Sequence, residues 1–341
     1  MLRRIAALLG FLLGLVGLAL LVRSLPKDQS PALLTNALHT RDEPLRHNWR
    51  LVDGKYWQIV ADQLEEVAET DRREGNRGVC APGMIEVKGG MRVDPPGLGM
   101  FDMRSIEEQQ KLACTKWINR EYPERCASFD KQRWTEVAAT YAVRGMHFCI
   151  DRYEYPNQKG AYPVIFVNYD EAESVCENEG KRLCNEDEWT FACEGEEALP
   201  YPYGFVRDAE ACVIDKKWRA FNTAAMHPRD GDAARGEMDR LWQGVPSGTQ
   251  DRCKSPFGVY DMTGNVDEWT TSTRPGRVSI LKGGYWGPVR TRCRPSTRSH
   301  DENHTFYQQG FRCCSDPGAI RPVGTAWSAD PSMAPLPREL R

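Results

Sequence analysis

The sequence predicts a loop-rich, disulfide-stabilised domain of mixed helices and strands that follows an N-terminal transmembrane helix. An uninterrupted apolar run near the N-terminus predicts the transmembrane helix. All twelve cysteines follow Val79, so any disulfides belong to the remainder of the chain. Short strand-like and helix-like segments alternate there with long irregular ones, and a domain of that kind needs crosslinks to hold its loops.

The apolar run covers residues 5–22 and lies behind Arg3 and Arg4. Its length is within the usual range for a helix that crosses a bilayer. The segment fits either a cleaved signal peptide or an uncleaved anchor, and the absence of a small-x-small cleavage motif in residues 18–26 favours the anchor. Residues 1–4 are then expected in the cytoplasm, and the rest of the chain in a periplasm or a lumen.

Composition limits the function further. An even number of cysteines outside the cytoplasm is typical of a disulfide framework. Zinc is disfavoured because the sequence has no CxxC pair or Cys/His cluster at zinc-ligand spacing. The net charge of −3 is close to balance, so no nucleic-acid partner is expected.

Residues 23–79 are predicted to join the anchor to the domain. The part from Ser24 to Arg50 is polar with little periodicity and indicates a tether. From Trp57 onward, apolar residues recur at helical spacing until Gly75 can end the helix, so a stalk helix is predicted.

Capping residues predict three helices in the domain, which is expected to span residues 80–316. Ser105, with Glu108 three residues later, would begin a helix that continues to Arg120. The same spacing begins two more helices, at Asn168 with Glu171 and at Asn185 with Glu188.

Other segments of the chain carry simpler signals. Apolar runs within 84–87 and 146–157 indicate strands. The charged stretch Asp230–Arg240 indicates a surface loop. Residues 317–341 form a Pro-rich tail without apolar periodicity, which is expected to be extended or disordered.

Several motifs of the domain resemble the sulfatase-modifying-factor family, whose best-known member is the formylglycine-generating enzyme. In chain order they are VNYDEAESVCENEGKRLCNEDEWTFACEG, DMTGNVDEW, LKGGYW, CRPSTR and GFRC. The resemblance covers about residues 80–316. It implies a compact α+β fold related to C-type lectins, low in regular structure and rich in loops.

The resemblance also implies two disulfides, Cys176–Cys313 and Cys193–Cys293, with Cys314 as a rival partner in the second pair. In the loop-entropy model, bridges that close loops of about 100 residues or more each contribute roughly 4 to 5 kcal/mol.

Calcium is implied by the same family. Relatives bind it at the positions of Asp261, Gly264, Val266 and Glu268, through two carboxylates and two backbone carbonyls. Ca²⁺ takes oxygen ligands from sharply turning loops, so the residue types suit it. From the residues alone, the alternative is a plain Gly-Asn turn with solvated acids.

Copper and iron are not expected. Formylglycine-generating enzymes bind copper(I) between two cysteines that follow a glycine pair, and soft thiolates suit that ion. Here Pro288 stands at the first cysteine's position, and Cys293 is interpreted as a structural half-cystine. Iron-dependent relatives use three histidine ligands, which the matching positions of this chain do not provide.

Four residues are the candidates for catalysis: Cys293, Arg298, His300 and His304. The two histidines flank two acids, a group that can bind a metal or act as acid and base, although such a run is more often a hydrated loop. The planar guanidinium of Arg298 can bind a carboxylate or a peptide carbonyl. Its alternative role is an ion pair with Asp267 or Glu268.

These observations favour a membrane-anchored, extracytoplasmic member of this family with calcium and disulfides as structural elements. Its groove would bind a peptide, a glycan or a partner such as an envelope protein, without copper chemistry. The alternative is a metal-dependent oxidoreductase of the same family with a non-standard ligand set. Pro288 favours the first hypothesis.

Overall fold

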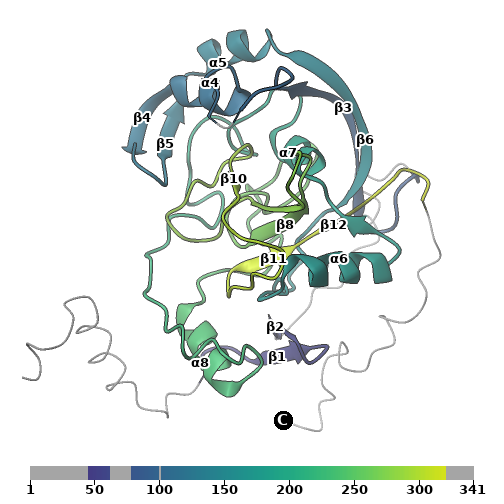
Figure 1. Cartoon of the computed structure of the whole chain (residues 1–341), viewed down its shortest axis with the longest axis vertical. Coiled ribbons are helices and arrows are strands. Elements are labelled where there is room, and N and C mark those ends of the chain that lie inside the picture. The colour runs from purple at the N-terminus through teal and green to yellow at the C-terminus, as the bar shows by residue number, and fades with distance from the viewer. Residues whose placement is uncertain (1–44, 62–77, 100, 320–341) are drawn as a thin grey trace, which may run out of the picture. The chain divides into compact units, whose positions relative to one another are not determined.

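The computed structural model describes residues 45–61, 78–99 and 101–319 of the chain (Figure 1). The helices and strands of these residues are, in order, β1 (Trp49–Val52), β2 (Tyr56–Ile59), β3 (Met84–Val93), α4 (Ile106–Leu112), β4 (Cys114–Asn119), β5 (Arg125–Phe129), α5 (Lys131–Ala138), β6 (Ala142–Asp151), α6 (Tyr169–Asn178), β7 (Arg182–Leu183), α7 (Glu186–Glu194), α8 (Asp232–Leu241), β8 (Asp267–Thr271), β9 (Ser279–Lys282), β10 (Ser296–Thr297), β11 (Gln309–Phe311) and β12 (Cys313–Ser315).

Two four-stranded sheets organise these elements. In the sheet β3-β6-β12-β7, the long strands β3 and β6 pair antiparallel, from Met84 opposite Asp151 to Val93 opposite Ala142. Figure 1 shows these two strands curving together along one side. In the sheet β10-β9-β8-β11, only β8 and β11 run parallel. Helices beside largely antiparallel sheets agree with the predicted α+β class.

Helices α6 and α7 begin at the capping boxes that the sequence predicts. The Asn168 side chain accepts a hydrogen bond from the backbone N–H of Glu171, while the Glu171 carboxylate accepts one from the backbone N–H of Asn168. Asn185 and Glu188 form the same reciprocal pair. Helix α7 packs against β6, β8 and β9, and its Trp189 is fully buried there.

All twelve cysteines of the sequence form disulfides. The six pairs are Cys80–Cys149, Cys114–Cys126, Cys176–Cys313, Cys184–Cys314, Cys193–Cys293 and Cys212–Cys253. Both pairs that the resemblance implies are present, and Cys314 pairs with Cys184 instead of competing for Cys193. Strand β12 is therefore tied to α6 and to the segment between β7 and α7.

The start of the domain differs from the prediction. Strand β2, expected at the beginning of a stalk helix, pairs with β1 as a hairpin. Trp57 bridges to Ile165, and its indole is buried in the cluster that contains α8. The described residues from Arg46 onward therefore belong to the same compact unit as the predicted domain.

A turn signal in the sequence explains the hairpin. Asp53 and Gly54 both have positive φ, and the Lys55 amide bonds to the Val52 carbonyl. An Asp-Gly pair between strand-forming residues is the usual hairpin signal, and it overrides the helical spacing of the apolar residues here. The predicted stalk residues from 62 to 77 lie outside the described residues.

Two predictions inside the domain were also wrong. The helix that Ser105 caps ends at Leu112 because the next residues form β4, which pairs with β5. The stretch Asp230–Arg240, predicted as a loop, largely forms α8, in which Ala234, Met238 and Leu241 are buried. Those residues recur at positions i, i+4 and i+7, an apolar face that the surrounding charges obscure in the sequence.

The predicted anchor at residues 5–22 lies outside the described residues, as does almost all of the Pro-rich tail. Within the described part of the chain, no helix combines the length and apolar character that a membrane crossing requires.

Candidate functional site

The segment after Gly283 and Gly284 offers no thiol for copper. Cys293 is fully buried and bonded to Cys193. Pro288 has no ligand atom, and Trp286 is buried with its ring 4.7 Å from that of Trp242. The loop is thus packed into the core, and Cys293 is a half-cystine instead of a catalytic thiolate.

The turn assigned to calcium has the sharp geometry that the sequence predicts. Gly264 has φ +85°, and a Cβ on it would lie 2.3 Å from the Val213 carbonyl oxygen, so only glycine fits. Asp261 is buried, and its Oδ2 accepts from the Gly248 amide at 2.6 Å. The turn therefore brings this carboxylate and the neighbouring carbonyls into the protein interior.

Glu268, the second predicted carboxylate ligand, is held by a cation of the chain itself. Its two oxygens accept from Arg312 at 2.6 and 2.7 Å, and Oε2 also accepts from Trp189 Nε1 at 2.8 Å. The pair of Glu268 and Arg312 is fully buried. Any ion at this turn would share Glu268 with that guanidinium.

Glu154 is a third buried acid beside this turn, and sequence reasoning missed it. Its Oε2 accepts from Ser247 Oγ and from Asn265 Nδ2, both at 2.7 Å. Burial raises the pKa of the Glu154 carboxyl well above its ordinary value, and the charges of Asp261 and Glu268 raise it further. No local motif marks Glu154, because it lies 93 and 111 residues before its partners Ser247 and Asn265.

The cluster therefore disfavours the ionised forms of its acids. Burial likewise raises the pKa of Asp261 to about 7. The charge of Arg312 lowers the pKa of Glu154 and of Asp261, and a divalent cation would likewise favour the ionised forms of such a group. Among the described residues, no set of three or more His, Cys, Asp or Glu side chains is arranged to hold a metal. A calcium ion here would depend on backbone carbonyls as well as on carboxylates.

The structure brings His300 and His304 together. Their rings stack with centroids 3.7 Å apart, and His304 Nδ1 lies 3.2 Å from Gln309 Oε1. Burial lowers the pKa of both imidazoles, and the neighbouring His304 lowers that of His300 further. The carboxylate of Glu302 is engaged by Ser279 Oγ at 2.7 Å. The two rings thus form a packed pair, and neither lines the cavity described next.

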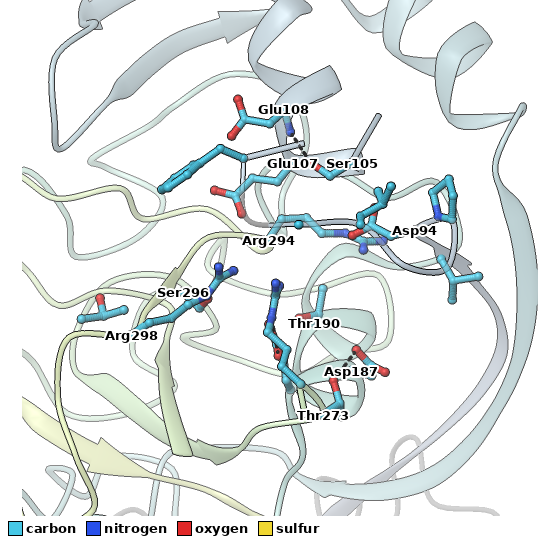
Figure 2. A pocket seen from close by; sticks show the side chains of 18 of the residues that line it. Asp94, Ser105, Glu107, Glu108, Asp187, Thr190, Thr273, Arg294, Ser296 and Arg298 are labelled. Atoms are coloured by element: carbon cyan, nitrogen blue, oxygen red, sulfur yellow. Dashed lines mark hydrogen bonds and ion pairs between the residues drawn. The ribbon is translucent and has the colours of Figure 1, made fainter. Parts of the chain in front are cut away.

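A cavity of about 440 Å³ lies among the end of β3, the start of α4 and strand β10. Figure 2 shows Glu107 and Arg298 directed toward the same space from opposite sides. Arg298, a candidate from the sequence, lines this cavity, and its Nε donates to Ser296 Oγ at 2.9 Å. Its alternative role, an ion pair with Asp267 or Glu268, is absent among the described residues.

Five arginines line the cavity: Arg144, Arg274, Arg290, Arg294 and Arg298. Three of them pair with carboxylates, in the pairs Arg144–Asp187, Arg274–Glu186 and Arg294–Glu194. Arg290 and Arg298 have no carboxylate partner among the described residues, and both donate to Ser296. Sequence reasoning found Arg298 but missed Arg290 and Glu107, since only folding brings them together.

Comparison with known proteins shows which family this domain resembles. The model of the sulfatase-modifying factor enzyme 1-like domain matches residues 107–317. The inactive C-alpha-formylglycine-generating enzyme 2 of Bos taurus is 30% identical over 177 residues, covering 49% of this chain and 54% of that protein. The formylglycine-generating enzyme of Mycobacterium tuberculosis is 28% identical over 188 residues, 47% of this chain and 59% of that enzyme.

Among solved structures, PvdO from Pseudomonas aeruginosa is similar with a TM-score of 0.40 at 15% identity, covering 68% of this chain and 94% of that one. The chain spans little more than half the length of the two curated relatives named above. Since the domain match extends over more than half of the sequence, the chain belongs to the sulfatase-modifying factor enzyme 1-like domain family.

Proposed function

We propose that this chain is a membrane-anchored, extracytoplasmic member of the family that binds a peptide, a glycan or a partner protein without copper-dependent formylglycine chemistry. The observation that carries the proposal is the Cys193–Cys293 disulfide, which, with Pro288 at the other position, leaves no thiolate for copper(I). The relative of Bos taurus named as inactive supports a non-catalytic role. Six disulfides fit an extracytoplasmic domain, and the apolar run at residues 5–22 supports the anchor.

Calcium is part of the proposal as a structural ion. The carboxylates of Asp261 and Glu268 and the carbonyls of Gly264 and Val266 would hold it. The ion would supply positive charge to a buried cluster that has a single guanidinium. The raised pKa of Glu154 supports this assignment, because it marks a group of buried acids whose ionised forms a bound cation would stabilise.

Metal analysis and turnover test the proposed function. The purified full-length chain, supplied with copper(I) and oxygen, is expected to bind far less than one copper per chain. It should form no aldehyde product from a cysteine-containing peptide, whereas the M. tuberculosis relative serves as the active control. Stoichiometric copper with aldehyde formation, or stoichiometric iron that is lost on His300→Ala, would contradict the proposal and favour an oxidoreductase.

A further inference from the structure

The cavity lies along the free edge of a sheet. Strand β10 is at the end of the order β10-β9-β8-β11, so one of its edges has no neighbouring strand in the part of the chain that the structure describes. The consecutive residues 296–299 all line the cavity. Ser296 and Thr297 form β10, and Arg298 and Ser299 continue from its end, so the cavity lies beside this edge strand.

Positive charge collects beside this edge. Arg290 donates to the Ser296 carbonyl at 3.1 Å, and Arg298 to its hydroxyl. Behind them, Arg292 is 4% exposed and donates to the Gln110 side chain, and Lys282 is 1% exposed and donates to a carbonyl. These four cations, two that line the cavity and two that are buried, have no carboxylate partner among the described residues.

Six acidic side chains line the cavity beside its five arginines. Most are engaged: Asp187 and Glu186 by arginines, Glu108 and Glu124 by Lys111, and Asp94 by the Ile106 amide. Glu107 has no hydrogen bond or ion pair among the described residues. Although burial raises the pKa of Glu107, the charges of Arg292, Lys111, Arg290 and Lys282 hold it below its ordinary value. A ligand carboxylate would therefore find its partners in Arg290 and Arg298, the two arginines of the cavity that pair with no carboxylate among the described residues.

The rim of the cavity is aromatic. Phe101 is 72% exposed and Tyr122 is 74% exposed, and the Arg290 guanidinium lies 5.0 Å from the Tyr122 ring centroid. Exposed aromatic rings beside an open strand edge suit the side chains of an extended peptide, whose backbone can pair with the strand.

We propose that this cavity binds an extended peptide segment along β10, with an acidic side chain or a C-terminal carboxylate held by Arg290 and Arg298. The guanidinium groups match a carboxylate in charge and geometry, and the strand edge matches the peptide backbone. This inference rests on the proposed binding function and names its ligand class.

Selection from a displayed library of random nine-residue peptides on the purified full-length chain tests this proposal. We expect the selected peptides to be enriched in Asp and Glu at one position or at the C-terminus. Fluorescence anisotropy then measures the affinity of one selected peptide and of its amide analogue, in which Asp is replaced by Asn. The analogue is expected to bind at least about ten-fold more weakly, because it loses a charge-assisted bond.

Arg298→Gln should weaken the acidic peptide by a similar factor and leave the amide analogue unchanged. Arg252→Gln is the matched control, since Arg252 is exposed outside the cavity and pairs with Asp208. The affinity of this variant for the acidic peptide should stay within about two-fold of that of the unaltered chain. Equal melting temperatures of the two variants would show that folding is not the cause.

Selected peptides without acidic enrichment, or an amide analogue that binds as tightly as the acid, would overturn the proposal. So would an acidic oligosaccharide that binds through Arg298 and displaces the peptide, because the cavity would then recognise a glycan. The copper assay is independent of these results. Aldehyde formation would reject the proposed function, whereas absent acidic selectivity would reject only the ligand class.

Discussion

Lys282 shows how strongly single buried charges shape this domain. Its ammonium donates to the Arg294 carbonyl at 2.8 Å and lies 5.3 Å from the Trp189 ring centroid. Burial, with the charges of Arg294 and Arg274 adding to it, lowers the pKa of Lys282 to about 8. A buried cation without a carboxylate partner in hydrogen-bond contact lowers stability.

The pH dependence of stability tests this residue. The unfolded chain has a Lys pKa of 10.5, so between pH 8 and 10.5 it binds more protons than the folded chain. Stability should therefore rise with pH in that window, by up to about 1.4 kcal/mol per pH unit from this group. Lys282→Met should remove that slope and raise stability at pH 7, as measured by urea unfolding from pH 7.5 to 9.5.

The exposed Lys254 provides the control for that measurement, and Lys254→Met should leave the slope as it is in the unaltered chain. An unchanged slope in Lys282→Met would mean that the ammonium keeps its charge in the folded protein without loss of stability.

Disulfides connect the elements of the fold that hydrogen bonding leaves separate. Helix α7 is joined by Cys193 to Cys293, just before β10, across a sequence separation of 100. The hairpin of β4 and β5 is closed by Cys114–Cys126 across a separation of 12. The first bridge organises distant parts of the chain, including one wall of the cavity, whereas the second reinforces a local hairpin.

Removing these two bridges should have unequal effects. Loop entropy assigns about 4.7 kcal/mol to a loop of about 100 residues and about 3 kcal/mol to one of about 15. Cys193→Ala with Cys293→Ala should therefore lower the melting temperature more than Cys114→Ala with Cys126→Ala, in calorimetry of the full-length chain. Equal losses would indicate that the unfolded chain retains structure around the longer loop.

The molecule as a whole combines little regular structure with many buried charges. Its six disulfides restrict the unfolded chain, and the cluster around Arg312 gathers buried acids whose ionised forms an ion would stabilise. An ion bound only by the folded chain would stabilise all parts of the domain through one equilibrium.

Calcium should therefore raise the melting temperature of the full-length chain, and a chelator should reverse the change. At 100 times its dissociation constant, an ion of this kind contributes about 2.7 kcal/mol. Asp261→Asn should abolish the calcium effect, whereas Asp251→Asn, at an exposed acid, should preserve it. A melting temperature insensitive to calcium in the unaltered chain would leave Arg312 as the cation of the cluster.

Much of the fold could be predicted from local residues and from family motifs. The capping boxes at Asn168 and Asn185 begin α6 and α7 as expected, and Gly264 occupies a turn that needs positive φ. Two disulfides followed from the resemblance. The candidate site was predicted only in part, since Arg298 lines the cavity while His300 and His304 lie apart from it.

The sequence by itself determined the features that depend on a few neighbouring residues: helix starts, the glycine turn, the apolar N-terminal run and the loss of a cysteine at Pro288. Only the tertiary structure decided that Trp57 lies in a strand, that Glu154 joins a cluster 112 residues away, and that Glu107 faces Arg298. The physical reason is the distance along the sequence between the residues whose contacts stabilise each feature. A cap or a turn is stabilised by bonds within one helical turn, whereas a buried charge cluster or a cavity forms only when distant segments pack together.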